Sequence, residues 1–236
     1  MRLKITIETK NKFIPFEYHG FLQGVIYHSL DKEQGNFFHD EGFGEQRIYK
    51  MFVFSELSGH YHVVKGGLMF DETASFYVSS VSSKLLNTLY EKVHQEGFIY
   101  LGKTKFKVVE AIPVKDVIYH EDHVYYLTTI SPIVCYKTDA KKFMTFFHPK
   151  SQDFELSLQE NLRRKYLTLF EDDTNELFEI QEIIKYRNTK VKYKKMVYNA
   201  YNCTMKVKVS PGYLKLLMHV GLGSKNAAGF GMIRIL

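Results

Sequence analysis

The alternation of hydrophobic and polar residues predicts a strand at the start of the chain and a helix after it. Leu3, Ile5 and Ile7 alternate with polar neighbours, which is the period of two expected of a strand with one buried face. After Pro15, apolar residues in the segment Tyr18–Leu30 recur at spacings of three and four, as in an amphipathic helix. The chain therefore opens with a strand followed by a helix.

The rest of the first half continues this pattern. Segments rich in branched and aromatic residues predict strands at Ile48–Phe54, Leu68–Val78 and Lys105–Val114. Between the last two, Ser82–Glu96 has a helical stripe of apolar residues and ends near Gly97, a residue that commonly stops helices. The first half is thus predicted to have the element order β-α-β-β-α-β.

The second half is interpreted in the same way. We expect strands at Val124–Ile130, Ile180–Lys195, Tyr201–Val209 and Gly231–Leu236, a helix at Asp153–Phe170, and a last helix that begins at Pro211 and stops at Gly221. Two successive β-α-β-β-α-β units are typical of tandem ferredoxin-like domains. We therefore predict an α+β fold of two tandem ferredoxin-like domains, residues 1–118 and 119–236, with a C-terminal glycine-rich loop.

Composition places the chain among globular proteins. Hydrophobic residues make up 45% and charged residues 25%, which is ordinary for a folded domain. No run of about 18 apolar residues predicts a membrane span, and the first ten residues do not form the apolar stretch of a signal peptide. We expect a cytoplasmic protein without a membrane partner, in which Cys135 and Cys203 are reduced.

Charge is distributed unevenly along the sequence. Residues 1–182 hold 21 Lys and Arg against 26 Asp and Glu, whereas residues 183–236 hold eleven Lys and Arg and no acidic residue. A solvated basic face is one explanation, but a polyanionic partner accounts better for so long a stretch without acid. This distribution favours nucleic acid, and RNA in particular, as the partner.

The basic residues of this stretch are interleaved with tyrosines, whose rings can stack on bases. In the segment Thr204–Val209, strand alternation places two of the lysines on one face. The predicted phosphate-binding residues are Lys185, Arg187, Lys190, Lys192, Lys194, Lys195, Lys206 and Lys208.

A glycine-rich loop follows the last predicted helix. Glycine lets backbone N–H groups approach a phosphate without obstruction from side chains. The loop runs from a helix into a strand, unlike the P-loop or the dinucleotide-binding fingerprint, and a plain turn is the alternative interpretation. The residues predicted to contact RNA here are Gly221, Gly223, Ser224, Lys225, Asn226, Gly229 and Gly231.

Three segments together resemble a known family. They are Gly24-Val25-Ile26-Tyr27, the segment from His39 to Lys50-Met51-Phe52, and Gly221-Leu222-Gly223 with Gly229-Phe230-Gly231-Met232. The chain is similar to the CRISPR-associated, repeat-processing endoribonucleases, Cas family six of the RAMP superfamily. The resemblance implies cleavage of CRISPR repeat RNA in precursor transcripts to give crRNA, without metal or cofactor. It implies that the 2′-hydroxyl is the nucleophile and that the products carry 2′,3′-cyclic phosphate and 5′-hydroxyl ends.

That reaction needs a general base, a proton donor and a positive charge near the phosphate. The resemblance assigns these to His39, Tyr27 and Lys50, although the first two could exchange roles. His28, next to Tyr27, is an alternative to His39, and Arg47 is an alternative to Lys50.

Two pairs of histidines, His60 with His62 and His120 with His123, have spacings that suit a shared metal ion, but no nearby carboxylates or thiolates complete a ligand set. We therefore expect no metal site. The alternative functions are a non-catalytic RAMP subunit that holds guide RNA in an interference complex and a general single-strand RNA-binding module. Besides repeat RNA, other Cas proteins and a second copy of the chain are candidate partners.

Overall fold

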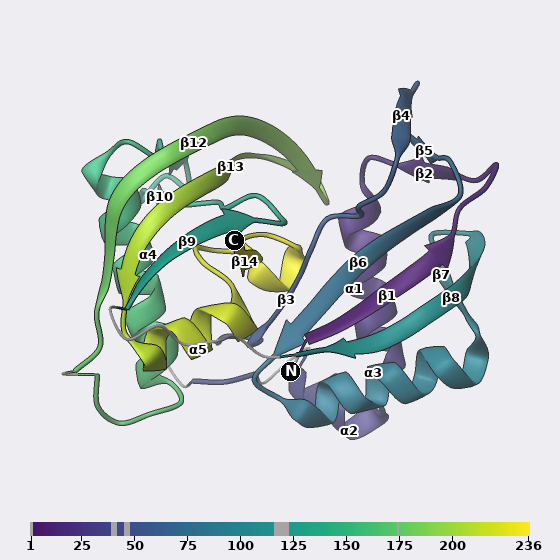
Figure 1. The fold of residues 1–236 in the computed structure, drawn as a ribbon, viewed down its shortest axis with the longest axis horizontal. Coiled ribbons are helices and arrows are strands. Elements are labelled where there is room, and N and C mark those ends of the chain that lie inside the picture. The colour runs from purple at the N-terminus through teal and green to yellow at the C-terminus, as the bar shows by residue number, and fades with distance from the viewer. Residues whose placement is uncertain (1, 39–41, 45–47, 116–122, 174) are drawn as a thin grey trace.

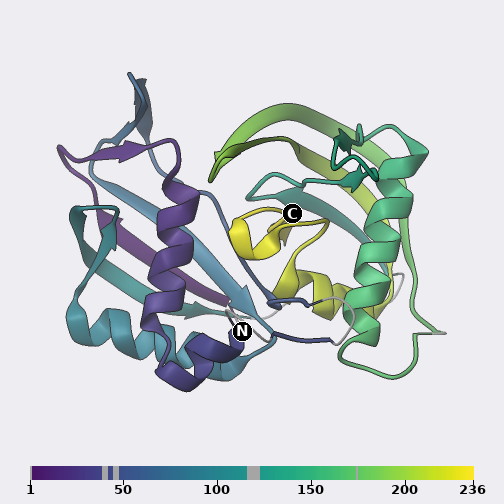
Figure 2. The ribbon, with the colours of Figure 1, turned by 180° about the vertical axis from the view of Figure 1, so that it is seen from behind.

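The computed structural model describes residues 2–38, 42–44, 48–115, 123–173 and 175–236. It has a mixed α/β architecture in which two main antiparallel sheets lie side by side (Figure 1). Seen from behind, α1 and α3 cover one face of the first sheet, and α4 lies along the second (Figure 2). Each half of the chain therefore has its own sheet and helices, and the two halves meet at a junction.

The first half contains a five-stranded sheet, order β3-β6-β1-β8-β7, and a small three-stranded sheet, order β2-β5-β4. Its elements are β1 (Arg2–Glu8), β2 (Phe13–Pro15), α1 (Tyr18–Ser29), α2 (Lys32–Asn36), β3 (Phe52–Phe54), β4 (Tyr61–Val64), β5 (Gly67–Phe70), β6 (Thr73–Ser80), α3 (Ser83–Glu96), β7 (Phe98–Leu101) and β8 (Thr104–Val114).

Strand alternation and helix periodicity build the core of the first half. Leu3, Ile5 and Ile7 of β1 are fully buried and face the apolar stripes of α1 and α3. The Ser82 side chain caps the N-terminus of α3 by accepting a hydrogen bond from the Leu85 amide. Gly97, in the left-handed conformation, ends the same helix. Both helices are thus fixed against the sheet by local sequence signals.

The second half contains a four-stranded sheet, order β12-β13-β9-β14, and a small hairpin of β10 and β11. Its elements are β9 (Val124–Thr129), β10 (Tyr136–Thr138), β11 (Met144–Phe146), α4 (Gln152–Leu167), β12 (Phe178–Tyr193), β13 (Met196–Val209), α5 (Pro211–Val220), the 3₁₀ turn η2 (Asn226–Ala228) and β14 (Ile233–Ile235).

A long hairpin of β12 and β13 dominates the second half. It arches over the other elements, and its tip points toward the first half (Figure 1). β9 pairs with β13 only over Thr204–Lys208, so much of the hairpin extends beyond the sheet as a two-stranded ribbon. A separate apolar cluster, which includes Val191, Tyr193, Tyr198 and Phe230, supports this extension.

Direct contacts join the two halves. The Arg2 guanidinium donates to the carbonyls of Met218, at 3.1 Å, and Ile233, at 2.9 Å. The Ser131 hydroxyl donates to the Phe54 carbonyl at 3.2 Å. Because these bonds connect β1 and β3 with the second half, the two sheets are held in a defined relation.

The predicted sequence of main elements is confirmed, with corrections in detail. The strand predicted at Leu68–Val78 is two strands, β5 and β6, separated by a turn at Asp71 and Glu72. The two strands predicted at Ile180–Lys195 and Tyr201–Val209 are one continuous hairpin whose turn is Lys194 and Lys195. Lys194 has a φ of 54°, a conformation that lysine rarely adopts, so residue type did not indicate this turn. The predicted boundary at residue 118 lies outside the described residues.

Candidate functional site

A cleft of about 460 Å³ lies between the two halves. It is bordered by α1, the segment 48–52, the tip of the β12–β13 hairpin, α4 and the glycine-rich loop. Four lysines, and no acidic residue, are among its described lining residues. Those lysines are Lys50, Lys165, Lys194 and Lys225. The cleft is therefore electrostatically suited to a polyanion.

One face of α1 borders the cleft. His19, Gln23 and Tyr27 follow each other at spacings of four, which places them in a row along the helix. The buried His19 makes a hydrogen bond of 3.1 Å between its Nδ1 and the Ala228 carbonyl. Gln23 and Tyr27 line the cleft itself. The same helix face thus contacts the glycine-rich loop and presents a candidate catalytic side chain.

Tyr27 is half-buried, with its ring edge-to-face against Phe52 at a centroid distance of 5.7 Å. Its hydroxyl donates to the Phe38 carbonyl at 3.3 Å. Burial raises the pKa of Tyr27 to about 12, because the charged phenolate is poorly solvated there. The hydroxyl therefore keeps its proton near neutral pH and suits a donor better than a base.

The structure describes the positions of only some of the other predicted catalytic residues. Lys50 lines the same cleft as Tyr27. His39 and Arg47 lie outside the described residues, although Phe38, the residue before His39, is the hydrogen-bond partner of Tyr27. His28 is exposed and lines a different hollow, between α1 and α3. The structure thus brings Tyr27 and Lys50 together and separates His28 from them.

The glycine-rich loop, residues 221–231, is tightly packed. A Cβ at Gly229 would collide with the rings of Phe54 and His19, and a Cβ at Gly231 would collide with the Leu222 carbonyl. Both glycines also have φ values of 76–85°, which side-chain-bearing residues rarely adopt. These two positions require glycine for the shape of the loop, whatever the loop binds.

Many polar groups of the loop bond within the protein. The amides of Leu222, Ser224, Gly229 and Gly231 donate to backbone carbonyls at 2.9 Å. The Asn226 side chain is buried, and its Nδ2 donates to the carbonyls of Leu222, at 3.0 Å, and Phe230, at 2.9 Å. Asn226 therefore braces the loop from inside. Gly223, Ser224 and Lys225 line the cleft.

Lys165 of α4 is a site residue that the sequence reasoning missed. It is only 4% exposed, and its ammonium donates to the carbonyls of Gly221 and Gly223, both at 3.1 Å, and to Asn226 Oδ1 at 2.7 Å. A signal was present in the sequence. Asn161 and Lys165 fall on the same helical stripe as the buried Phe154 and Leu158, where polar residues are unexpected.

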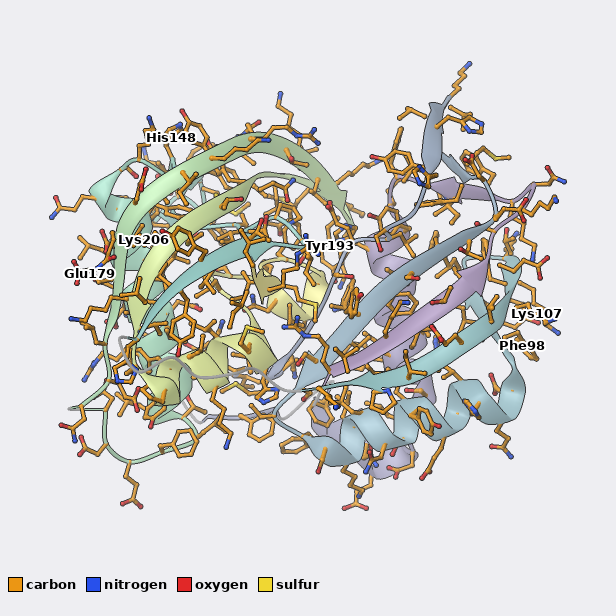
Figure 3. All side chains as sticks on the ribbon, in the orientation of Figure 1. Phe98, Lys107, His148, Glu179, Tyr193 and Lys206 are labelled. Carbon is orange, nitrogen blue, oxygen red and sulfur yellow. The ribbon has the colours of Figure 1, made fainter. Side chains whose placement is uncertain are left out.

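The predicted RNA-binding residues of the hairpin divide by position. Lys185, Arg187, Lys190, Lys192, Lys194 and Lys195 are exposed along β12 and its turn. The Lys192 ammonium pairs with the Glu17 carboxylate at 2.7 Å, which lowers the pKa of Glu17. Tyr193, at the tip of the hairpin (Figure 3), and Tyr198 are buried in the apolar cluster described above, so these two rings serve the core.

Lys206 and Lys208 lie together on one face of β13, as predicted: Met205, Val207 and Val209 are buried, and the two lysines are not. Glu182 and Glu179 of β12 are their cross-strand partners. Figure 3 places Lys206 and Glu179 away from Tyr193 and the hairpin tip. Opposite charges therefore lie side by side on this part of the sheet.

The first of the two histidine pairs does not gather with further metal ligands among the described residues. His60 and His62 are exposed, and His62 Nδ1 lies 4.0 Å from an oxygen of Asp71. His120 lies outside the described residues. Over the described parts of the chain, three or more His, Cys, Asp or Glu side chains nowhere gather as a metal would need. Within those parts, too, none of the helices is long and apolar enough to span a membrane.

Comparison with protein families matches nearly the whole chain. Residues 13–112 match the model of the CRISPR-associated protein Cas6, N-terminal, and residues 112–235 match that of the CRISPR-associated protein Cas6, C-terminal. CRISPR-associated endoribonuclease Cas6 1 of Methanocaldococcus jannaschii is 27% identical, covering 99% of this chain and 92% of the relative. CRISPR-associated endoribonuclease Cas6 of Pyrococcus furiosus is 22% identical, covering 94% of this chain and 83% of the relative.

Solved structures share the fold. The structure of a Cas6-related protein from Pyrococcus furiosus superimposes with a TM-score of 0.86 at 21% identity, covering 100% of this chain and 98% of that one. A RAMP protein described as binding different RNA substrates superimposes with a TM-score of 0.83 at 18% identity, covering 100% and 99%. The overall arrangement of the two halves is thus shared with proteins of that class.

Proposed function

This chain belongs to the Cas6 family of CRISPR-associated proteins and is an endoribonuclease of CRISPR repeat RNA, and we propose that the reaction takes place in the cleft between its two halves. The observation that carries this placement is the composition of the cleft. Tyr27, Lys50 and the glycine-rich loop border one hollow with four lysines and no acidic residue among its described lining.

In the proposed mechanism, a base removes the proton of the 2′-hydroxyl, and the resulting oxyanion attacks the adjacent phosphorus. The bond from phosphorus to the 5′ oxygen breaks, and that oxygen takes up a proton. The products are a 2′,3′-cyclic phosphate and a 5′-hydroxyl. Every bond change is served by proton transfer and charge stabilisation, so the mechanism requires no metal or cofactor.

The side chains have distinct proposed roles. We assign His39 as the base, since an ordinary histidine titrates near neutral pH. Tyr27 is assigned as the proton donor to the 5′ oxygen, because burial raises the pKa of its hydroxyl and keeps it protonated at neutral pH. Lys50 is assigned to stabilise the negative charge on the phosphorane. On binding RNA, Tyr27 would exchange its bond with the Phe38 carbonyl for one with substrate.

Binding of the RNA is assigned mainly to the second half. Lys194, Lys195, Ser224 and Lys225, with the exposed basic residues of β12, are proposed to contact the RNA backbone around the cleft. The buried loop residues Gly221, Gly223, Asn226, Gly229 and Gly231 are proposed to shape the loop. We also propose that residues 1–118 and 119–236 are two tandem ferredoxin-like domains. In support, four neighbouring strands of the first sheet, β3-β6-β1-β8, and the four strands of the second, β12-β13-β9-β14, have the same order. When each set of four is numbered along the chain, both read second, third, first, fourth across the sheet, as in a ferredoxin-like domain.

The catalytic assignment is tested with a repeat RNA encoded beside the gene, in EDTA and with enzyme in excess. We expect His39→Ala to lower the cleavage rate by about 10²–10⁴-fold, the usual contribution of a positioned base, while the dissociation constant for RNA stays near that of the unaltered protein. His62→Ala, which changes an exposed histidine far from the cleft, is the control. Undiminished cutting by His39→Ala would remove His39 from the mechanism.

A further inference from the structure

Gln23 has an unusual position among the residues of the cleft. Its Nε2 donates to the Ala227 carbonyl at 2.7 Å, and its Oε1 accepts from the Tyr193 hydroxyl at 2.6 Å. Ala227 belongs to the glycine-rich loop, and Tyr193 ends β12 at the hairpin tip. One side chain of α1 therefore connects two segments that are both proposed to bind RNA.

We propose that Gln23 is a positioning residue that couples the glycine-rich loop and the β12–β13 hairpin to the helix face bearing Tyr27. The inference rests on the proposed function of this cleft. It assigns Gln23 no contact with the reacting atoms. Its role is to fix the position of RNA-binding elements of the second half relative to a catalytic side chain of the first half.

The chemistry of the side chain supports this role. The Ala227 carbonyl accepts a hydrogen bond, so it needs a donor. The hydroxyl of the buried Tyr193 has a pKa raised by its burial, so it stays protonated and needs an acceptor. A primary amide offers both in one planar group. Glutamate would keep the acceptor and lose the donor, and leucine would lose both at similar volume.

The hairpin needs an anchor at its tip. Two-stranded ribbons are marginally stable by themselves, and the tip lies beyond the segment of β13 that pairs with β9. Its ion pair, Lys192 with Glu17, has side chains that are 55% and 40% exposed, and such pairs contribute little. The bond of Tyr193 to Gln23 is the better protected of the two links to α1.

The glycine-rich loop is held from both halves. Lys165 of the second half binds its carbonyls from one side, and His19 and Gln23 of α1 bind η2 from the other. His19 is buried, whereas Gln23 lines the cleft. The hairpin and the loop also touch directly, through the rings of Tyr198 and Phe230. Gln23 is thus a described contact that joins both of these segments to the Tyr27 face of α1.

Three variants separate the two links. Gln23→Leu removes both hydrogen bonds, Gln23→Glu removes the donor to Ala227, and Tyr193→Phe removes only the bond from the hairpin. Gln95→Glu, at the exposed end of α3, is the control for the introduced charge. Each is assayed for the cleavage rate at saturating repeat RNA, for RNA binding, and for amide hydrogen exchange of residues 188–198 and 221–231 in the RNA-free protein.

We expect Gln23→Leu to lower the saturating rate about tenfold, the order for loss of one or two neutral hydrogen bonds, with less than a threefold change in the dissociation constant. Exchange should quicken in both segments in Gln23→Leu, and in residues 188–198 alone in Tyr193→Phe. A purely structural role would instead lower thermal stability and leave the saturating rate unchanged.

The outcomes separate this inference from the proposed function. If the unaltered protein cleaves and Gln23→Leu cleaves within twofold of it, only the inference is overturned. If the unaltered protein does not cleave, the proposed function fails, and the exchange data decide the coupling. Faster exchange in both segments of Gln23→Leu would then support the coupling, and unchanged exchange would overturn it.

Discussion

Replacing Lys165 by methionine should destabilise the glycine-rich loop, because it removes the side chain that bonds to the loop carbonyls. The ammonium donates three hydrogen bonds, to the carbonyls of Gly221 and Gly223 and to the side-chain oxygen of Asn226. Bonds from a charged donor stabilise by about 1.5–3 kcal/mol each, which gives roughly 5–9 kcal/mol for the three. The three bonds share one ammonium, so their contributions do not simply add, and the apolar methionine recovers part of the loss because it can be buried without a charge to desolvate. We therefore expect Lys165→Met to lower the free energy of unfolding by about 2–4 kcal/mol.

The loss is measured by urea unfolding at pH 7.5 and by thermal unfolding, in which the midpoint should fall by roughly 5–15 °C for a chain of this size. Cleavage should fall as well, because the loop borders the cleft. The matched control is Lys215→Met, which removes an exposed lysine of α5. An unfolding free energy for Lys165→Met within about 0.5 kcal/mol of the control, the range of ordinary surface changes, would refute this account of the loop.

Three further predictions concern pH, charge and backbone shape. Burial raises the pKa of Glu56 to about 7 from an ordinary 4.5. The folded protein therefore loses stability as pH rises from 4.5 through 7, because the buried carboxyl must ionise. In urea unfolding, Glu56→Gln should be more stable than the unaltered protein at pH 8, by on the order of 1–3 kcal/mol, but not at pH 4. Lys194→Ala, in the cleft, should weaken RNA binding several-fold more than Lys208→Ala, whose cross-strand partner is acidic, and equal losses in a binding assay would contradict that ranking. Gly229→Ala should destabilise by about 2 kcal/mol or more, through strain and overpacking, and by more than Gly97→Ala, where the new Cβ meets open space; similar thermal midpoints for the two would count against the packing argument.

Much of the fold could be predicted because its main elements have clear periodicity. Alternation in β1 and the stripes of α1 and α3 reflect burial on one side, which local sequence records directly. Short elements such as β7 and β10 were not predicted, since four or three residues do not establish a period. The turn at Lys194 was missed because its left-handed conformation is imposed by the paired strands and not by residue type.

The site could be predicted only where the residue types themselves indicate charge or proton-transfer chemistry. The acid-free charge distribution and the glycine-rich loop indicated a polyanion, and Tyr27 and Lys50 do border one cleft. The roles of Lys165 and Gln23 depend on tertiary contacts between segments far apart in sequence. Such contacts leave at most an indirect signal, such as the polar residues on the buried stripe of α4.

The pairing of β12 with β13 places acidic residues beside some of the basic residues of the C-terminal stretch. In the sequence, Lys206 and Lys208 belong to a stretch without acid, yet β12 brings Glu182 and Glu179 beside them. The lysines of the cleft have no acidic residue among its described lining. We therefore rank the cations expected to bind RNA by their three-dimensional neighbours and not by their distance along the chain.

The central claim is metal-independent cleavage of repeat RNA through its own 2′-hydroxyl. The most direct measurement is single-turnover cleavage, in EDTA, of the cognate repeat RNA and of the same RNA with one 2′-deoxy substitution beside the scissile phosphate, with the product ends mapped. We expect one cut in the unmodified RNA, with ends bearing 2′,3′-cyclic phosphate and 5′-hydroxyl. The 2′-deoxy RNA should still bind and should stay intact. Cutting of the 2′-deoxy RNA at the same position, or cutting only after magnesium is added, would contradict this claim.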